Sequence, residues 1–394
     1  MAESEFQVTH VTADTDRHRS YRLRYKVFVE EQAKSVAAAD HERKIIKDEL
    51  DDLAEHFAVF HKGEMVASMR ILYGAEKLTP FVANSYSIDR FGHIPADRLS
   101  FCGRLFVLPA YRNSAALFLL VQHAYRASRE RGTQIDVICC RPNLVRLYEQ
   151  LGYRRYRPHF EDHAGQGFLI PLVLILDDLE YLKTVRSPLY VSARKLPSDP
   201  SVAQWFKQAF PDYRSFVSPI TVGADRFMEI MAGKINDSEV GMLRGMTEAE
   251  RQVLYASTTH IEIAAGTKLI RKGDNGKELF LILDGVAEAR LPNTGGEVVL
   301  ATHGRGDITG EMSLLTGRPR SANVVATTDL EVICFDDDGL RKLMKGQPAV
   351  AAKLLHNLSR ILAERLEITS SQLATAIRSN EVQASGFTAG PTAA

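Results

Sequence analysis

Residues 107–116 of this 394-residue chain combine a strand end, a turn and a helix start rich in small side chains. The segment reads Val-Leu-Pro-Ala-Tyr-Arg-Asn-Ser-Ala-Ala. A helix amino terminus presents unpaired N–H groups and a positive dipole, and small side chains let a phosphate approach the backbone. The segment therefore fits a pyrophosphate-binding turn, and it fits an ordinary strand-to-helix turn equally well.

Residues 306–323, in the last third of the chain, carry groups suited to one small anionic nucleotide. A short helix that follows a glycine supplies backbone N–H groups for a phosphate. A carboxylate can accept a hydrogen bond from a ribose hydroxyl, and a buried arginine can pair with a cyclic phosphate. The chain therefore contains two candidate sites for phosphate-bearing ligands.

The elements that must position the first segment alternate between strand-like and helix-like patterns, which predicts a mixed α/β domain over residues 1–195. The predicted elements are a hairpin at 57–60 and 65–72 with Gly63 in its turn, a helix at 115–131 ending at Gly132, a strand at 135–140, a helix at 143–151 closed by Gly152, and a buried strand at 168–176.

The second segment lies in a mainly β region. Residues 196–240 contain several prolines and predict a partly helical linker. Thr247 and Glu250 fit a helix capping box, and the glycine-punctuated β runs that follow predict an antiparallel β-roll. C-terminal helices at about 339–345 and 348–367 complete a domain over 241–368, and the Ala-, Ser- and Thr-rich residues 369–394 predict a disordered tail.

The amino-acid composition argues against several classes of function. The chain has 49 Lys and Arg against 49 Asp and Glu, so no global field attracts nucleic acid or an anionic membrane. Four cysteines without a CxxC pair argue against a structural zinc site, and we expect no metal. The absence of a signal peptide pattern and of a long apolar run predicts a cytoplasmic protein without a transmembrane segment.

A cluster of basic residues lies near the amino terminus. The cluster, at positions 17–26, contains Arg17, Arg19, Arg22, Arg24 and Lys26. It suits contact with an acidic acyl carrier protein or with the phosphates of coenzyme A, and it equally suits a solvated helix face.

The turn at 107–112, followed by Arg-Pro-Asn-Leu-Val-Arg-Leu-Tyr-Glu-Gln-Leu-Gly-Tyr at 141–153, resembles the GNAT acyltransferase superfamily. The resemblance implies that Tyr148 is the general acid for the departing thiolate and that backbone N–H groups near Val107 hold the oxyanion. Ala115 and Ala116 stand where the common pattern has glycine. The acyl-donor residues implied are Val107, Arg112, Asn113, Ser114, Ala115, Ala116, Leu117 and Asn143.

A further set of residues looks like the autoinducer synthase branch and the related N-acyl amino acid synthases. The matching positions are Arg24, Phe28, Asp48, Asp51, Arg70 and Arg104. Those enzymes transfer long acyl chains, often from acyl carrier protein, to the amine of an amino acid or its derivative. By resemblance, the two aspartates orient an ammonium group or its deprotonating water, and Arg70 and Arg104 hold a carboxylate or organise the acids. The acidic run at 48–52 also fits a solvated loop.

Two departures from the autoinducer synthase pattern favour simple N-acylation over homoserine lactone synthesis. Phe101 stands where those enzymes carry a glutamate, and the tryptophan expected after the Val-Phe element is missing, since the only tryptophan is Trp205. A cyclic nucleotide-regulated protein lysine acetyltransferase and a non-catalytic sensor of acyl groups and nucleotides remain as alternatives.

Residues 243–366 resemble cyclic nucleotide-binding domains, with 310–321 matching the phosphate-binding cassette. The resemblance implies that the N–H groups of Gly310, Met312 and Ser313 face the phosphate. Glu311 holds the ribose 2′-hydroxyl, Arg320 pairs with the phosphate, and Ser321 adds a hydroxyl contact that permits cAMP or cGMP.

In this family the last helix closes over the base. The apolar face of that helix suits packing within the domain or a homodimer contact, and it contains Leu354, Leu355, Leu358, Ile361 and Leu362. Only 28 residues follow Leu366, too few for a helix-turn-helix, so no DNA partner is expected.

The sequence thus predicts a GNAT-like mixed sheet with flanking helices, followed by an antiparallel β-roll with C-terminal helices. The predicted function is a cyclic nucleotide-regulated N-acyltransferase. Its donor is an acyl-CoA or acyl carrier protein thioester, its effector is a cyclic nucleotide, and its acceptor is a small-molecule amine.

Overall fold

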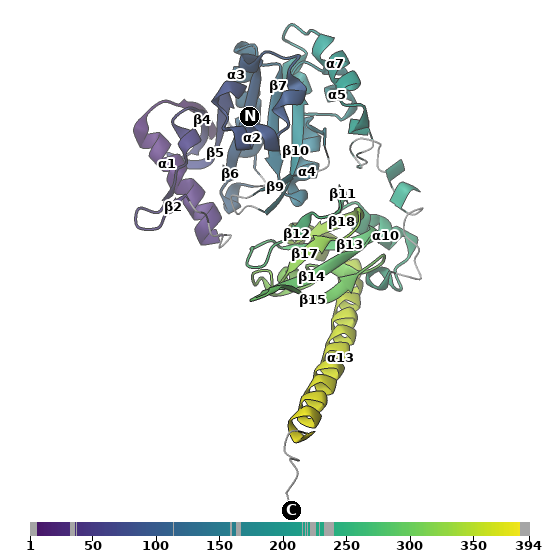
Figure 1. Cartoon of the computed structure of the whole chain (residues 1–394). Helices are drawn as coiled ribbons and strands as arrows, with labels where there is room; N and C mark the ends of the chain where they lie inside the picture. The colour runs from purple at the N-terminus through teal and green to yellow at the C-terminus, as the bar shows by residue number, and fades with distance from the viewer. Residues whose placement is uncertain are drawn as a thin grey trace, which may run out of the picture.

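The structure is a computed structural model that describes residues 6–31, 36, 38–112, 114–157, 160–162, 167–214, 216, 218, 220, 226–227, 229–231 and 240–386. Figure 1 shows a mixed α/β unit beside a β-roll, with one long helix running away from the roll. Both predicted architectures are confirmed.

The first unit is built on an eight-stranded sheet with the order β1-β4-β5-β6-β7-β10-β8, and β9 pairs with β10. Among the described strands of this sheet, β6 and β7 are the one parallel pair. The strands are β1 (Phe6–Val11), β4 (Glu55–His61), β5 (Glu64–Tyr73), β6 (Leu99–Val107), β7 (Ile135–Cys140), β8 (Arg154–Arg155), β9 (Phe160–Asp162) and β10 (Gly167–Ile175).

Helices cover this sheet and close its connections. They are α1 (Asp14–Tyr25), η1 (Lys26–Glu31), α2 (Pro80–Ser85), α3 (Ala116–Glu130), η7 (Pro142–Leu144), α4 (Val145–Leu151), α5 (Leu179–Thr184) and α6 (Tyr190–Ala193). Gly63 lies in the β4–β5 turn, Gly132 follows α3 and Gly152 follows α4, and all three have positive φ. These positions favour glycine, which is why the sequence predicted the turn and both helix ends.

The second unit is a β-roll of two four-stranded antiparallel sheets, ordered β11-β18-β13-β16 and β12-β17-β14-β15. The strands are β11 (Thr259–Ile263), β12 (Lys268–Ile270), β13 (Glu278–Asp284), β14 (Ala287–Asn293), β15 (Gly296–His303), β16 (Ile308–Thr309), β17 (Asn323–Ala326) and β18 (Leu330–Asp336). The helices are α10 (Glu248–Tyr255), α11 (Glu311–Thr316), α12 (Asp337–Gly346) and α13 (Pro348–Gly386). The Thr247–Glu250 capping box is present.

Two segments differ from expectation. In the predicted linker, α7 (Ser201–Ala209) packs Val202, Ala203 and Phe206 into the core of the first sheet, so this part of the linker is fixed by burial. The predicted disordered tail is helical as far as Gly386, because residues 369–386 contain no proline and continue α13 without a break. Residues 387–394 lie outside the described part.

Candidate active site and nucleotide-binding site

Strands β6 and β7 separate along their length. They pair at Leu99–Ile135, Ser100–Asp136 and Phe101–Val137. Beyond Phe101, β6 continues to Val107 and, among the described strands, pairs there with β5 alone. We call the gap between residues 102–107 of β6 and 138–140 of β7 the wedge. Strand edges without a partner present backbone N–H groups, so the wedge can hold a thioester carbonyl.

Arg104 lies at an irregularity in β6 beside the wedge. Ser68 pairs with Phe106 and Arg70 with Gly103, so β6 carries one more residue than β5 over this stretch. Arg104 has a positive φ of 53°, which is uncommon outside glycine. A bulge of this kind turns a side chain toward a new direction, and here it brings the Arg104 guanidinium to Asp48.

The acids and arginines predicted for the acceptor site form one ion network. The Arg24 Nη1 atom lies 2.7 Å from Asp51 Oδ2, and Arg70 Nη1 lies 2.9 Å from Asp51 Oδ1. Asp48 also pairs with Arg70, and its Oδ2 lies 2.6 Å from Arg104 Nη2. The structure therefore gathers four elements here: α1, the loop at 48–52, β5 and β6.

Exposure separates the two aspartates of this network. The side chains of Asp51 and Arg24 are completely buried, whereas 18% of the Asp48 side chain and 15% of the Arg104 side chain are exposed. Asp48 and Arg104 are therefore the members of this network best placed to meet a ligand from solvent, since the Arg70 side chain is 9% exposed. Asp51 acts through Arg24 and Arg70, and Arg24 does not belong to an exposed basic face.

Charge balance sets the ionisation of the acids. Burial alone would raise the pKa of Asp48, but Arg70 and Arg104 outweigh it and lower that pKa below its usual range. Burial lowers the pKa of His56, which packs beside Asp51. Three arginines thus face two aspartates and a neutral histidine, which leaves one positive charge that suits a carboxylate ligand.

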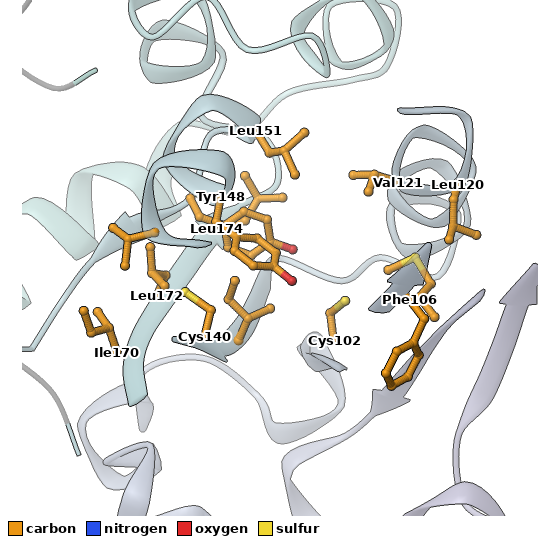
Figure 2. Close-up of a cluster of buried hydrophobic side chains, with 14 of the residues drawn as sticks. Cys102, Phe106, Leu120, Val121, Cys140, Tyr148, Leu151, Ile170, Leu172 and Leu174 are labelled. Atoms are coloured by element: carbon orange, nitrogen blue, oxygen red, sulfur yellow. The ribbon is translucent and has the colours of Figure 1, made fainter. Parts of the chain in front are cut away.

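Tyr148 lies on α4, on the other side of the wedge. Figure 2 shows it beneath α4 with Cys140, Leu172 and Leu174, facing the side of α3 that carries Leu120 and Val121. Tyr148 is 8% exposed, and burial raises the pKa of its hydroxyl well above the usual value. The phenol is therefore protonated at neutral pH and can donate a proton.

A cavity lies between the sheet and α3, at the closed end of the wedge. Its empty volume, which includes space open to solvent, is about 310 Å³. The lining is mostly apolar and consists of Met69, Ile71, Cys102, Val121, Ala124, Tyr125, Ser128, Asp136, Tyr153, Leu174, Leu176 and Leu189. A mostly apolar cavity at this place suits a hydrocarbon chain.

Asp136 is a buried acid in this cavity that was not singled out from the sequence. Ser100 Oγ and Tyr153 Oη donate hydrogen bonds to its carboxylate at 2.5 and 2.6 Å. Burial raises the pKa of Asp136 to about 7. A lone aspartate inside the apolar strand Ile-Asp-Val-Ile-Cys-Cys was the available signal.

We expect Asp136→Asn to change how stability depends on pH. The pKa of Asp136 is about 7 in the fold and about 3.9 when unfolded, so the unfolded chain releases this proton first. Wild-type stability should therefore fall by about 1 kcal/mol per pH unit between pH 5 and 7 from this group, and the asparagine variant should lack that slope. Urea unfolding from pH 5 to 8 measures the difference, and identical slopes would contradict the assignment.

The predicted donor turn begins α3 beside the wedge. Arg112 donates from Nε to the Val107 carbonyl at 3.2 Å and pairs with Glu31, which fixes the turn. Ser114 Oγ accepts from the Ala116 N–H at 3.2 Å. Ala115 immediately precedes α3, and Leu117 lies in its first turn. Asn113 lies outside the described residues.

Asn143 is placed differently from the other donor residues. Its side chain hydrogen-bonds to Asp336 of the β-roll, so it faces the second unit. The structure therefore brings the 107–117 turn and Tyr148 to the wedge, and it turns the Asn143 side chain toward the domain boundary.

The predicted nucleotide residues converge at the start of α11. Gly310 has φ 85° and precedes α11, and a Cβ there would lie 2.6 Å from Arg320 Nη1. Arg320 is buried and donates to the Gly310 carbonyl at 2.8 Å. Only glycine allows this approach, which places a guanidinium beside the free N–H groups of the helix start.

The remaining cassette residues surround the same point. Glu311 is buried and its Oε1 accepts from Arg365 Nη1 of α13 at 3.0 Å, so the carboxylate that was predicted to bind a ribose is linked to the last helix. Ser313 is buried, Met312 is 52% exposed, and the exposed Ser321 hydroxyl contacts Met312. Leu354 and Leu358 of α13 pack into the core of the β-roll domain, with Leu355 and Ile361 against them.

We expect Arg320→Gln to weaken cAMP binding by about 10-fold to 150-fold, because a charge-assisted hydrogen bond contributes about 1.5–3 kcal/mol. Calorimetry on the full chain measures this. Arg341→Gln is the control, since that α12 side chain is 65% exposed and pairs with Asp337 away from the cassette. An unchanged Kd in Arg320→Gln would contradict a phosphate site at Arg320.

Within the described ranges, no group of three or more His, Cys, Asp or Glu side chains could hold a metal ion. No described helix has the length and apolar character needed to cross a membrane.

Comparison with known families identifies both units. The family model described as "Acetyltransferase (GNAT) domain" matches residues 23–122, and the model described as "Cyclic nucleotide-binding domain" matches residues 260–347. The first matched range contains the ion network and β6, and the second contains the cassette.

Curated relatives match the second unit. The cAMP-dependent protein kinase regulatory subunit of Mycosarcoma maydis is 32% identical over 142 residues, which are 36% of this chain and 26% of that protein. The CRP-like cAMP-activated global transcriptional regulator of Mycobacterium tuberculosis is 27% identical over 141 residues, 36% of this chain and 61% of that protein. The chain thus spans about a quarter of the kinase regulatory subunits and less than two thirds of the regulator.

Among solved structures, a cyclic nucleotide-binding domain from Methylobacillus flagellatus is similar, with a TM-score of 0.35 and 26% identity. That match covers 39% of this chain and 85% of the other. With both family models in place, the chain carries a GNAT-type acetyltransferase domain followed by a C-terminal cyclic nucleotide-binding domain.

Proposed function

We propose that this chain transfers an acyl group from a thioester to the amine of an amino acid or related small molecule, under control of a cyclic nucleotide. The wedge carries the proposal. The support is that three features surround one gap: the part of β6 beyond its pairing with β7, the turn at 107–117 and the protonated Tyr148. That combination supports acyl transfer because each feature suits one group of the reaction. The strand N–H groups suit the oxyanion, the turn suits a phosphate of the donor, and Tyr148 suits the leaving thiolate.

The ion network supports an acceptor that carries a carboxylate. Arg104 and Asp48 form its partly exposed edge, and the network holds one more positive than negative charge. In the proposed complex the acceptor carboxylate binds Arg104, and a water beside Asp48 takes the proton from the acceptor ammonium. Asp48 is a weak base because its pKa is lowered, so it orients that water and does not keep the proton.

The proposed reaction then proceeds by addition and elimination. The neutral amine nitrogen attacks the thioester carbonyl carbon and forms the C–N bond, and backbone N–H groups of β6 hold the oxyanion. As the carbonyl reforms, the C–S bond breaks and the Tyr148 hydroxyl gives its proton to the sulfur. The amide nitrogen loses its extra proton to solvent, and a solvent proton restores the Tyr148 hydroxyl.

The mostly apolar lining of the cavity between the sheet and α3 supports a donor chain longer than acetyl. Each buried methylene contributes about 0.8 kcal/mol, so every further methylene that is buried favours binding of the donor by about fourfold. The carrier is coenzyme A or acyl carrier protein, which share the thioester and the phosphopantetheine arm.

We expect Ala124→Leu to shift the preferred donor toward shorter chains. Ala124 is 2% exposed and lines the cavity, so a larger side chain removes space there. The kcat/KM for a dodecanoyl donor should fall by about tenfold or more, as one or two methylenes of misfit cost about 1–3 kcal/mol, while that for acetyl-CoA changes little. An equal loss for both donors would contradict the placement of the chain.

Cyclic AMP or cyclic GMP is the proposed effector. The support is the Gly310–Arg320 contact and the link from Glu311 to Arg365 on α13, because a ribose that binds Glu311 changes the contact of the last helix. A reducing compartment such as the cytoplasm is supported by the cysteines, since Cys102, Cys139, Cys140 and Cys334 form no disulfide.

Thiol release by the full chain tests the proposed reaction. Acetyl-, octanoyl- and dodecanoyl-CoA and the matching acyl carrier protein thioesters are offered with a mixture of amino acids, with and without cAMP, and products are identified by mass spectrometry. The proposal predicts release from a long-chain donor and an N-acyl amino acid. Acetylation of a lysine peptide alone would favour a protein lysine acetyltransferase, and no release from any donor would leave a non-catalytic sensor.

A further inference from the structure

The boundary between the two domains is formed by the segment that contains the Tyr148 helix and its two flanks. Arg155 of β8 donates from Nη1 to the His260 carbonyl of β11 at 2.8 Å. The Asn143 side chain hydrogen-bonds to Asp336 at the end of β18. Arg141 Nη1 lies 3.9 Å from Glu278 Oε1 of β13. Three polar contacts thus connect residues 141–155 to the β-roll.

Glu278 contacts charged groups of both domains. Its Oε2 accepts from Arg320 Nη2 at 3.0 Å, and its Oε1 faces Arg141. The exposed side-chain fractions are 10% for Glu278, 4% for Arg320 and 19% for Arg141. Burial reduces solvent screening of these three charged groups. A change of charge beside Arg320 therefore alters the electrostatic interaction between Glu278 and Arg141.

A pocket of about 350 Å³ at the boundary places these three groups on common walls. Arg141, Pro142 and Phe168 line it from the acetyltransferase domain. The β-roll lines it with Leu269, Ile270, Arg271, Asp274, Gly276, Glu278, Phe280 and Arg320. The Glu278 carboxylate therefore lies in one pocket with both of its arginines.

The phosphate of a bound nucleotide competes with Glu278 for Arg320. The Arg320 guanidinium now binds the Gly310 carbonyl and Glu278, and burial lowers its pKa. A cyclic phosphate at the start of α11 would be a second anion beside the same guanidinium. Charge-assisted contacts to the phosphate weaken the hold of Arg320 on Glu278, which then interacts more strongly with Arg141.

Arg141 connects directly to the acyl site. It ends the segment after β7 and precedes η7 and α4, and Tyr148 lies in α4. Glu149 of α4 pairs with Arg155 at 3.1 Å, so the helix is anchored at both ends to residues that contact the β-roll. A shift of Arg141 therefore moves the start of α4 relative to the wedge.

From these contacts we propose that Glu278 is a positioning residue for the acyl site. It transmits occupation of the phosphate site from Arg320 through Arg141 to α4 and Tyr148. The inference rests on the proposed function for nucleotide binding and for the role of Tyr148, and it assigns the regulation to one carboxylate at the domain boundary.

Hydrogen exchange on the full chain tests this role without requiring catalysis. Saturating cAMP should change the exchange rates of amides in residues 142–151 by at least about threefold in the wild type. Arg141→Gln and Glu278→Gln should each abolish that change, and the double variant should resemble either single variant. Arg141→Lys, which keeps the charge, should retain the response, as should the control Arg341→Gln.

Calorimetry with cAMP on the same samples separates the outcomes. Binding to the wild type without any change at 142–151 overturns the role of Glu278 and leaves the proposed function intact. A response that survives in Arg141→Gln also overturns it. Absence of cAMP binding overturns both the proposed control by cAMP and the role of Glu278, because Glu278 then has no signal to transmit.

Discussion

Replacing Asp51 by asparagine is expected to lower the free energy of unfolding by about 3–5 kcal/mol. The Asp51 carboxylate and the Arg24 guanidinium are completely buried and their closest atoms are 2.7 Å apart. The substitution keeps the shape of the side chain but removes its charge, so Arg24 remains as a buried cation without its main counterion. Urea unfolding at pH 7 measures the loss.

Asp52→Asn is the matched control, because it makes the same change at the next residue. The Asp52 side chain is 63% exposed and pairs with Lys47 at the surface, so the expected change is within about 0.5 kcal/mol. If Asp51→Asn has the same free energy of unfolding as the wild type, the structural role of the network is contradicted.

The same pair predicts how wild-type stability responds to acid. Burial acts to raise the pKa of Asp51, but the hydrogen bond and charge of Arg24 outweigh it and hold that pKa well below its usual range. This contribution is present above about pH 4, where the unfolded carboxyl is ionised, and is lost as pH falls toward the folded pKa. Asp51→Asn should therefore lose less stability than the wild type below pH 4.

Tyr148→Phe is expected to lower kcat for thiol release by about 100-fold to 10,000-fold, the usual range for a general acid. The Tyr148 hydroxyl is protonated because burial raises its pKa well above the ordinary value, and its helix borders the wedge. Phenylalanine preserves the packing with Cys140 and Leu174 but has no proton to give. Initial rates with a saturating acyl thioester measure the effect.

The leaving group distinguishes proton donation from packing. A thioester of an acidic aryl thiol needs little protonation, so the loss in Tyr148→Phe should shrink with that donor. Tyr153→Phe is the control, because its ring lies 5.4 Å from the Tyr148 ring but its hydroxyl binds Asp136. Full activity in Tyr148→Phe, or an equal loss with both thioesters, would contradict the role of general acid.

Local sequence signals predicted most elements of both domains. The strand expected at 135–140 is β7, and the capping box at Thr247 and the glycine ends of α3 and α4 are where the pattern placed them. Each of these elements is determined by a few neighbouring residues: a run of apolar side chains for the strand, a capping pair for the helix start, and a glycine with positive φ for each helix end. The nucleotide cassette was predictable for the same reason, since Gly310, Glu311 and Arg320 are close in the chain.

The placement of charge inside the fold was not predictable in this way. Arg24 reads as part of a basic helix face and Asp51 as part of an acidic loop, yet tertiary packing buries them together. The sequence marks Asp136 as a lone acid in an apolar strand, but nothing near it in the chain indicates the cavity that it lines. The contact of Arg141 with Glu278 joins residues 137 positions apart, and nothing local in either segment indicates it.

The most direct test of the account is the rate at which the wild-type chain forms an N-acyl amino acid with and without cAMP. With a long-chain thioester and amino acid acceptors, mass spectrometry should detect the amide, and saturating cAMP should change its initial rate by about fivefold or more. Arg320→Gln should form the product without that response. Formation of product at one rate in both conditions, although calorimetry shows cAMP bound, would contradict coupling of the two domains.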